Sequence, residues 1–251
     1  MNRVIAVLNQ KGGVGKTTST INIAAGLARE GKTVLVIDLD PQANATSGLG
    51  LERDKIQNST YEVLVSGALA GDSTLATRID GLYILPAKTT LAAAEQELVA
   101  VMSRETVLKN ALATLSFDYI LIDCPPSLGL LSINALTAAH SVLIPVQTEF
   151  YALEGLGLLM QTIQRVQQGL NPNLKLLGVV MTMVDARNSL SAQVIAEVKK
   201  HFGEYVFQTF IPRNVRLAEA PSFGKTVFEH DKWSKGARAY KALTKEILNR
   251  E

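Results

Sequence analysis

The segment Gln10-Lys11-Gly12-Gly13-Val14-Gly15-Lys16-Thr17-Thr18, which comes just after the apolar run Val4–Leu8, predicts a strand, a glycine-rich turn and then a helix. Such a turn leaves a row of backbone N–H groups at the positive end of the helix dipole, where they bind a polyphosphate. In this type of loop the lysine, here Lys16, contacts the β- and γ-phosphates, and the Thr17 hydroxyl binds Mg²⁺. The segment therefore predicts a nucleotide phosphate site.

The phosphate loop departs from the usual G-x-x-x-x-G-K-[ST] pattern at two positions. Gln10 stands where the first glycine is expected, and a second lysine, Lys11, lies inside the loop. Both departures narrow the class of nucleotide-binding protein to which the chain can belong.

Composition limits the fold and the environment. The 251 residues are 47% apolar and 19% charged, which suits one sizeable core, so we expect a single domain over residues 1–251. The apolar runs are strand-sized and no charged-then-apolar leader precedes the first strand, so we expect a cytoplasmic protein without a membrane span.

Cys124 is the single cysteine, which excludes an internal disulfide and a cysteine-based zinc site. The net charge of +2 neither requires nor excludes nucleic acid.

Short apolar runs alternate with longer segments of helical pattern along the chain. The expected strands are Val4–Leu8, Thr33–Ile37, Leu82–Leu85, Tyr119–Ile122, Val142–Val146, Leu176–Met181 and Val206–Ile211. This alternation predicts an α/β fold, a doubly wound and mostly parallel sheet with helices on both faces, of the P-loop NTPase type. The first helix is expected from about Lys16 to Glu30, with Gly31 just past its end. Gly48–Gly71 has weak periodicity, so we expect a surface excursion there.

Asp123 is the first candidate for magnesium chemistry, because a nucleotide hydrolase needs a carboxylate near Mg²⁺ and a group that orients water. It ends the apolar run Tyr119–Ile122, so its carboxylate is expected at the carboxyl edge of the sheet, beside the phosphate loop. Taken alone, an Asp in this place is equally consistent with a cap. Cys124-Pro125-Pro126 contain no Glu to serve as a base, so the water-orienting group is expected elsewhere.

Asp38 and Asp40 bring two further carboxylates to the same edge, after the strand Thr33–Ile37. Their spacing of two puts both on one face of an extended segment. We expect one of them to hold the Mg²⁺ shell or the attacking water and the other to anchor the loop, and the spacing leaves open which does which. The structural alternative is that both acids cap the strand.

Several segments together resemble a known family. Lys11–Thr18, Asp38–Asn44, Asp123–Ser127 and Ile211–Asn214 resemble the deviant Walker ATPases. Within that group, the chain resembles the ParA/Soj chromosome- and plasmid-partition proteins over its whole length. Gln147–Gly155 and Ala218–Lys225 are similar to ParA/Soj in particular.

The resemblance implies a Mg²⁺-dependent ATPase that forms an ATP-sandwich homodimer, in which Lys11 contacts the phosphates bound by the partner subunit. A cation supplied in this way offsets transition-state charge as an arginine finger does. The resemblance also assigns the attacking water to Asp40 and a Mg²⁺-linked role to Asp123, with Lys16 as the second catalytic lysine. The residues expected at ATP are Lys11, Gly12, Gly13, Val14, Gly15, Lys16, Thr17, Thr18, Pro212 and Asn214, and those expected at Mg²⁺ are Thr17, Asp40 and Asp123. Pro212 and Asn214 are implied at the adenine, although Pro212 is also consistent with a strand terminator.

The resemblance further implies that the ATP-bound dimer binds DNA without sequence preference, through Arg187 and Arg216. Each arginine, taken alone, is also consistent with an ordinary solvated side chain. Two copies of a modest patch provide avidity that a monomer lacks, so a net charge of +2 is compatible with switchable binding. A ParB-like partner that stimulates hydrolysis, an association with the nucleoid, and a chromosome, plasmid or protein cargo are implied as well.

Two other classes of ATPase compete with this interpretation. A MinD-like membrane ATPase needs an exposed amphipathic C-terminal helix, and residues 236–251 carry the apolar stripe Ala237, Tyr240, Leu243 and Ile247. No bulky apolar face is present, so we expect this helix to dock on the sheet rather than bind a membrane. A redox ATPase like the nitrogenase iron protein needs cluster-ligating cysteines, which Cys124 alone does not supply.

Overall fold

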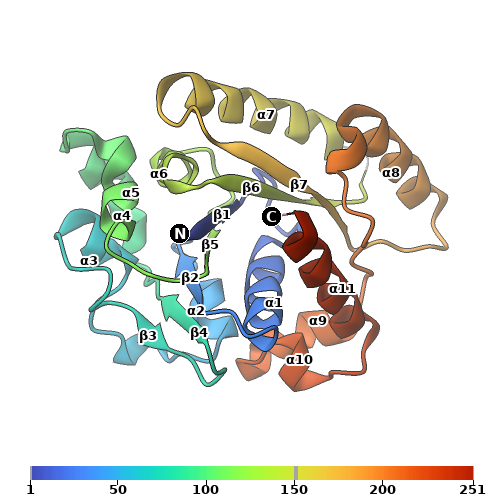
Figure 1. Ribbon diagram of the computed structural model, residues 1–251, viewed down its shortest axis with the longest axis horizontal. Helices are drawn as coiled ribbons and strands as arrows, with labels where there is room; N and C mark the ends of the chain where they lie inside the picture. Colours follow the sequence, from blue (N-terminus) through green and yellow to red (C-terminus); the bar gives the residue numbers. More distant parts are fainter. Residues whose placement is uncertain (1, 150–151, 251) are drawn as a thin grey trace.

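The apolar β-branched runs form the strands of one sheet in the computed structural model, which describes residues 2–149 and 152–250 (Figure 1). The strands are β1 (Arg3–Val7), β2 (Val34–Asp38), β3 (Leu75–Ala76), β4 (Leu82–Leu85), β5 (Tyr119–Asp123), β6 (Ser141–Gln147) and β7 (Lys175–Thr182). The longer helices are α1 (Lys16–Arg29), α7 (Ala152–Gly169), α8 (Ser189–Phe202) and α11 (Lys235–Arg250). The shorter helices are α2 (Asn44–Gly48), α3 (Thr60–Val65), α4 (Leu91–Glu97), α5 (Val107–Leu112), α6 (Leu130–Ala138), α9 (Val215–Glu219) and α10 (Val227–His230).

The order of the strands brings the candidate acids together. Over the described residues, seven strands lie in the order β3-β4-β2-β5-β1-β6-β7, and all neighbours are parallel except β3 and β4. The register pairs Asp123 with Val7 on one side and with Asp38 on the other. The ends of β1, β2 and β5 therefore lie at one level, and the phosphate loop begins there.

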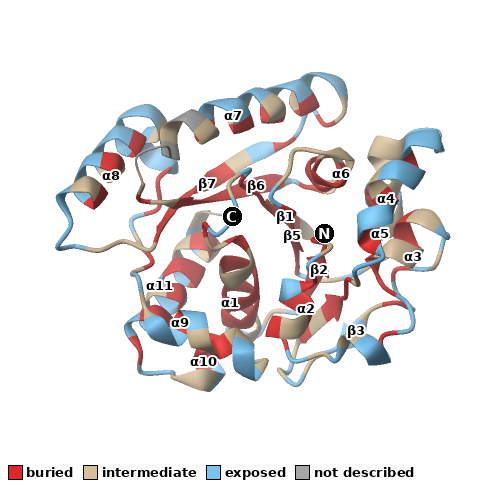
Figure 2. Cartoon of the chain, turned by 180° about the vertical axis from the view of Figure 1, so that it is seen from behind, coloured by how far each residue is buried: buried red, intermediate tan, exposed pale blue. Residues whose placement is uncertain are grey.

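Helices cover both faces of the sheet because successive strand residues point to opposite sides. Ile5 and Val7 of β1 pack on the side of α1 and α11, whereas Val4 and Ala6 pack on the side of α3 to α8. Figure 2 shows the buried residues concentrated on the sheet and on the inner side of α1. The predicted fold class, a doubly wound and mostly parallel sheet, is confirmed.

Helix α1 also ends as predicted. Gly31 lies just past the helix with φ 79°, a left-handed conformation that glycine adopts at little cost. The Lys32 amide donates to the Leu27 carbonyl at 3.2 Å, which satisfies one of the last carbonyls of the helix.

Two predictions about secondary structure are wrong. Val206–Ile211 runs beside β7 but forms only isolated bridges, because the Gln208 and Thr209 amides donate to the Glu246 carboxylate of α11 at 2.8 and 3.0 Å. Gly48–Gly71 is not simply a surface excursion: it contains α3, which begins with a capping box formed by Ser59 and Glu62 and buries Val63 and Leu64.

The C-terminal helix α11 docks on the sheet beside α1, as predicted. Its stripe of Ala237, Tyr240, Leu243 and Ile247 is buried, and the Tyr240 hydroxyl lies 3.0 Å from Ser19 Oγ of α1. In the part of the chain that the structure describes, no helix has both the length and the apolar character needed to cross a membrane.

Gly26 sets the distance between α1 and α11. A Cβ atom there would lie 3.1 Å from Thr244 Cβ and closer still to the Thr244 hydroxyl. We expect Gly26→Ala to lower the free energy of unfolding by about 1–3 kcal/mol through overpacking, despite the higher helix propensity of Ala. Chemical denaturation measures the loss, and adding Thr244→Ala should restore part of it. A Gly26→Ala variant as stable as the wild type would contradict this packing.

Candidate nucleotide site

The phosphate loop, residues 9–18, is shaped by two left-handed glycines and held by side chains of neighbouring strands. Gly13 and Gly15 have φ values of 75° and 87°, which residues with a side chain rarely adopt. The hydroxyl of Thr182, at the end of β7, donates to the Val14 carbonyl at 2.8 Å. Asn9 accepts from the Lys11 amide at 3.0 Å and donates to the Pro145 carbonyl at 2.7 Å. The loop is therefore anchored from β6 and β7.

Lys16 is a buried cation at the first residue of α1. Its Nζ donates to the Lys11 carbonyl at 3.1 Å, across the loop. Burial lowers the pKa of Lys16, and the nearby Asp123 and Asp40 carboxylates oppose this shift. A buried ammonium that has only a neutral acceptor gains strongly from an anionic phosphate.

Asp123 is fully buried at the end of β5 and accepts two hydroxyl hydrogen bonds from α1. Thr17 Oγ1 donates to Oδ2 at 2.7 Å, and Thr20 Oγ1 donates to Oδ1 at 3.1 Å. Burial, together with the nearby Asp38, raises the pKa of Asp123 to about 8, although the two hydroxyls oppose this shift. The structure thus joins Thr17 and Asp123, which were predicted to share the Mg²⁺ site.

Asp38 and Asp40 lie at the same edge, but their environments differ. Asp38 is fully buried and accepts from the Thr46 amide at 2.8 Å, the Thr46 hydroxyl at 2.6 Å and the Asp40 amide at 3.2 Å. Burial raises the pKa of Asp38 to about 6. Asp40 instead lines the cavity beside the phosphate loop and accepts from the Gln42 amide at 2.9 Å. Asp38 therefore anchors α2, whereas Asp40 faces the space for a ligand.

Lys11 differs from Lys16 in its exposure and partner. Its side chain is 41% exposed, and its ammonium forms an ion pair with Glu149, which follows β6. The side-chain amide of Gln147 donates to the other oxygen of that carboxylate at 2.5 Å. Both partners belong to the segment Gln147–Gly155, of which Phe150 and Tyr151 lie outside the described residues.

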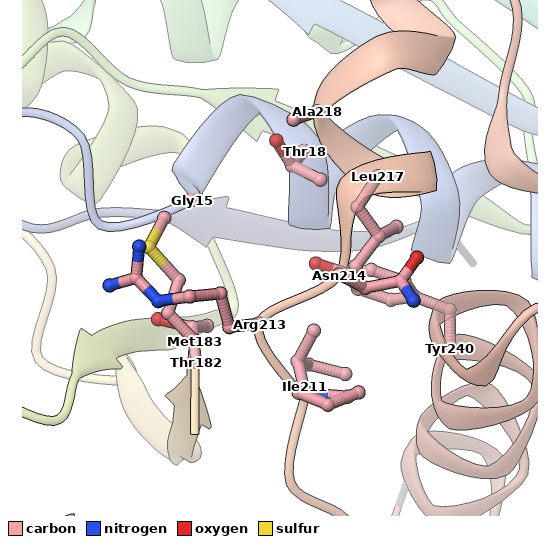
Figure 3. A pocket seen from close by; sticks show the side chains of 11 residues that line it. Gly15, Thr18, Thr182, Met183, Ile211, Arg213, Asn214, Leu217, Ala218 and Tyr240 are labelled. Carbon is pink, nitrogen blue, oxygen red and sulfur yellow. The ribbon is translucent and has the colours of Figure 1, made fainter. Parts of the chain in front are cut away.

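Two adjoining cavities meet at the start of α1. The first, of about 300 Å³, is lined by Gly12, Gly13, Gly15, Lys16, Thr17, Thr18, Asp40, Gln42, Asn44, Pro126 and Met183. The second, of about 270 Å³, is lined by Gly15, Thr18, Thr182, Met183, Ile211, Pro212, Arg213, Asn214, Leu217, Ala218 and Tyr240 (Figure 3). The backbone of the glycine loop and the charged side chains of Lys16 and Asp40 line the first cavity. Mostly apolar side chains line the second cavity.

The chemistry of the two cavities fits a nucleotide bound across them. Asn214 Oδ1 is buried and has no hydrogen-bond partner among the described residues, so it is free to accept from an exocyclic amino group such as that of adenine. Figure 3 shows Asn214, Leu217 and Tyr240 on one side of the second cavity and Gly15 and Met183 on the other. A base between them would leave its phosphates at the glycine loop. The Thr17 hydroxyl and the carboxylates of Asp40 and Asp123 are hard oxygen groups of the kind that Mg²⁺ prefers.

Met183 and Tyr240 are among the lining residues that the sequence does not assign to the nucleotide site. Met183 lines both cavities and has φ 51°, a strained conformation for a residue with a side chain. Tyr240 lines the second cavity and also makes the hydrogen bond to Ser19. Nothing in the sequence marks Met183, whereas the helical stripe of α11 marks Tyr240 only as a core residue.

The predicted DNA-binding arginines lie on separate elements and are already paired with acids. Arg187, in the turn after β7, contacts Asp185 at 3.0 and 3.1 Å, with a side chain that is 91% exposed. Its hydrogen bonds lower the pKa of Asp185 to about 2. Arg216 of α9 contacts Glu219 at 2.9 Å and Asp231 at 3.6 Å. Exposed pairs of this kind are weak and exchange readily for phosphate.

A family model and two curated relatives match this chain over most or all of its length. A family model described as an AAA domain matches residues 2–176. The sporulation initiation inhibitor protein Soj of Bacillus subtilis is 54% identical over 249 residues, which cover 98% of this chain and 98% of that protein. The chromosome partitioning protein ParA of Myxococcus xanthus is 49% identical over 253 residues, covering 100% of this chain and 89% of that protein.

A solved structure carries nucleotide in a closely similar fold. It is a Mycobacterium smegmatis protein, described as cobyrinic acid a,c-diamide synthase, with bound ADP and magnesium. It is 41% identical, with a TM-score of 0.87, and the match covers 99% of this chain and 95% of that one.

The raised pKa of Asp123 predicts a pH dependence of stability. Between its ordinary value of 3.8 and about 8, the folded protein holds a proton that the unfolded chain releases, so stability falls as the pH rises through this window. We expect Asp123→Asn to flatten this fall in the nucleotide-free protein and to raise its thermal midpoint at pH 8. Thermal denaturation from pH 5 to pH 8 measures both effects, with the exposed Asp54→Asn as the control. An unchanged slope in Asp123→Asn would contradict the assignment.

Proposed function

Because the chain belongs to the ParA/Soj family of partition ATPases, we propose that it is a Mg²⁺-dependent ATP switch. Its ATP-bound form dimerises and binds DNA without sequence preference, and hydrolysis releases the DNA. The observation that carries the proposal is the different placement of the two loop lysines. Lys16 lines the phosphate cavity, whereas Lys11 is half-exposed on Glu149, available to a second subunit.

ATP is the nucleotide of this family of ATPases, and Mg²⁺, when bound, offsets the charge on its phosphates. Lys16 exchanges the Lys11 carbonyl for the β- and γ-phosphates, and backbone N–H groups of the glycine loop donate to phosphate oxygens. The Thr17 hydroxyl would hold the ion through its oxygen while it donates its proton to Asp123, as it does in this structure. Asn214 Oδ1 accepts from the adenine amino group, next to Pro212.

Asp40 is the residue we assign to the attacking water. Its carboxylate lines the phosphate cavity, and one of its oxygens is oriented by the Gln42 amide. Asp38 is unsuited to this role, because Thr46 and the Asp40 amide occupy its oxygens. Lys11 of the partner then offsets charge that develops on the phosphates in the transition state.

DNA binding is assigned to Arg187 and Arg216. Both guanidinium groups are exposed and held by weak acid pairs, so phosphates can replace the acids. Dimerisation doubles the number of these contacts and provides avidity. The proposal includes a ParB-like partner that stimulates hydrolysis and a location at the nucleoid.

Asp40→Ala tests the assignment of the water. We expect it to bind ATP and dimerise but to hydrolyse ATP about 100-fold more slowly, since water orientation acts in the transition state. Single-turnover hydrolysis measures the rate. Asp38→Asn, as the matched variant, should lower the thermal midpoint instead, because the new side-chain NH₂ cannot accept from the backbone amide of Asp40 or Thr46. Wild-type hydrolysis by Asp40→Ala would remove Asp40 from the mechanism.

Lys11→Ala tests whether this lysine acts across a dimer. The variant should bind ATP about as tightly as the wild type, because Lys16 and Thr17 remain, yet stay monomeric with ATP. Sedimentation and calorimetry measure the two properties, and Lys55→Ala, which also loses an exposed ion pair, provides the control. Wild-type dimerisation in Lys11→Ala would refute the role in trans.

A salt titration tests the DNA assignment against the MinD-like alternative. ATP-dependent retention on unrelated duplexes should fall steeply with added salt, since phosphate binding releases counterions. Arg187→Glu and Arg216→Glu should each weaken retention and leave nucleotide binding intact. ATP-dependent pelleting with anionic liposomes would instead support a membrane switch. Liposome binding without salt-sensitive DNA retention would overturn the proposed function.

A further inference from the structure

Arg78 lies in the turn between β3 and β4, outside the nucleotide site, and contacts three separate segments. Its guanidinium donates to the Leu49 carbonyl at 3.3 Å, to the Gly224 carbonyl, and to both Glu229 oxygens at 2.5 and 3.1 Å. Leu49 follows α2, Gly224 follows the 3₁₀ turn Ala220–Phe223, and Glu229 belongs to α10. One planar fork of donors therefore joins segments that are far apart in the sequence.

The first of these segments begins at the nucleotide site. Asp40 lines the phosphate cavity, and α2 starts four residues later. The Thr46 amide and hydroxyl both donate to Asp38, so α2 is fixed to the end of β2. The loop of Asp40 and α2 are therefore positioned together by Asp38, and α2 ends next to the Leu49 carbonyl that Arg78 holds.

The second segment carries Arg216. Glu229, which pairs with Arg78, also caps α10 by accepting from the Thr226 amide and hydroxyl at 2.9 Å. His230, the next residue, contacts Glu219 at 3.4 Å, and Glu219 pairs with Arg216. The ring of His230 stacks on Phe223 in the turn after α9. Arg78 thus holds the segment 215–231, in which Glu219 pairs with Arg216.

Backbone contact reinforces the link between the two segments. A Cβ atom on Gly224 would lie 2.7 Å from Gly50 Cα, and a Cβ atom on Gly50 would lie 2.9 Å from the Gly224 carbonyl oxygen. Without side chains to adjust, the two backbones pack directly, and such packed contacts transmit small displacements. Figure 1 shows α2 and α10 at the same end of one helix layer.

We propose that Arg78 is a positioning residue that couples the loop of Asp40 to the segment 215–231. The bound nucleotide then determines how well ordered this segment is, and the segment carries Arg216. The part of this inference that concerns DNA rests on the proposed function. The Arg78 side chain is 40% exposed, so its ion pair contributes little to overall stability. Its role is to fix the positions of the two segments relative to each other. Because coupling is reciprocal, DNA on Arg216 also changes the affinity for the nucleotide by the same factor.

Hydrogen exchange with a nonhydrolysable ATP analogue and Mg²⁺, compared with ADP and Mg²⁺, tests the coupling without DNA. In the wild type we expect amides of 215–231 to exchange about fivefold or more slowly with the analogue. Arg78→Ala should remove most of this difference while both nucleotides still bind, and Arg78→Lys, which lacks the fork, should do the same. Arg104→Ala is the matched control, because Arg104 is 41% exposed, pairs with Glu105 and donates to the Val99 carbonyl.

The outcomes separate this inference from the proposed function. A wild-type difference that Arg78→Ala and Arg78→Lys both keep would overturn the coupling, as would the absence of any difference in the wild type. A difference that depends on Arg78, in a protein that shows no ATP-dependent retention on DNA, would support the coupling and overturn the DNA function. If the wild type retains DNA with ATP, Arg78→Ala should reduce the ratio of DNA affinities with ATP and ADP by about fivefold.

Discussion

The constraint on which the rest of the site depends is the burial of two carboxylates side by side. Asp38 and Asp123 end neighbouring strands in register, and both are fully buried. Burial raises the pKa of Asp123 to about 8 and that of Asp38 to about 6, so ionising both is costly. Each carboxylate has become an anchor: Asp123 accepts from the hydroxyls of α1, and Asp38 accepts from α2. Helix α1, which follows the phosphate loop, and α2, which follows the Asp40 loop, are fixed to the sheet through these two acids.

The same constraint explains why the site suits a metal nucleotide. A cation beside Asp123 and Asp40 would relieve the repulsion among the buried acids, and a polyphosphate would replace the neutral carbonyl that accepts from Lys16 with an anionic acceptor. Lys11 does not belong to this group of buried charges, because it is partly exposed and already paired with Glu149. An exposed ion pair contributes only about 0.2–1 kcal/mol, which is compatible with the proposed exchange of Glu149 for the nucleotide of a second subunit.

The sequence predicts those features that depend on local pattern. The glycine loop, the strands ending in Asp38 and Asp123, and the buried stripe of α11 follow from spacing and periodicity. Val206–Ile211 is misassigned because the acceptor of its amides, Glu246, is supplied by a helix almost forty residues away in the chain. The division of work between Asp38 and Asp40 depends on Thr46, which the spacing of the acids does not reveal. Met183 adopts a conformation that its residue type disfavours, and Arg78 belongs to no motif.

We propose, above all, that the Lys11 side chain leaves Glu149 and reaches the nucleotide of a second subunit. A crystal structure of Asp40→Ala with Mg²⁺ and ATP tests it most directly, since slow hydrolysis preserves the nucleotide. We predict a twofold dimer in which Lys11 Nζ of each subunit has left Glu149 and contacts the phosphates of the partner, with the adenine amino group at Asn214 Oδ1. A fully occupied Mg²⁺–ATP site in which Lys11 remains paired with Glu149 of its own chain would contradict it.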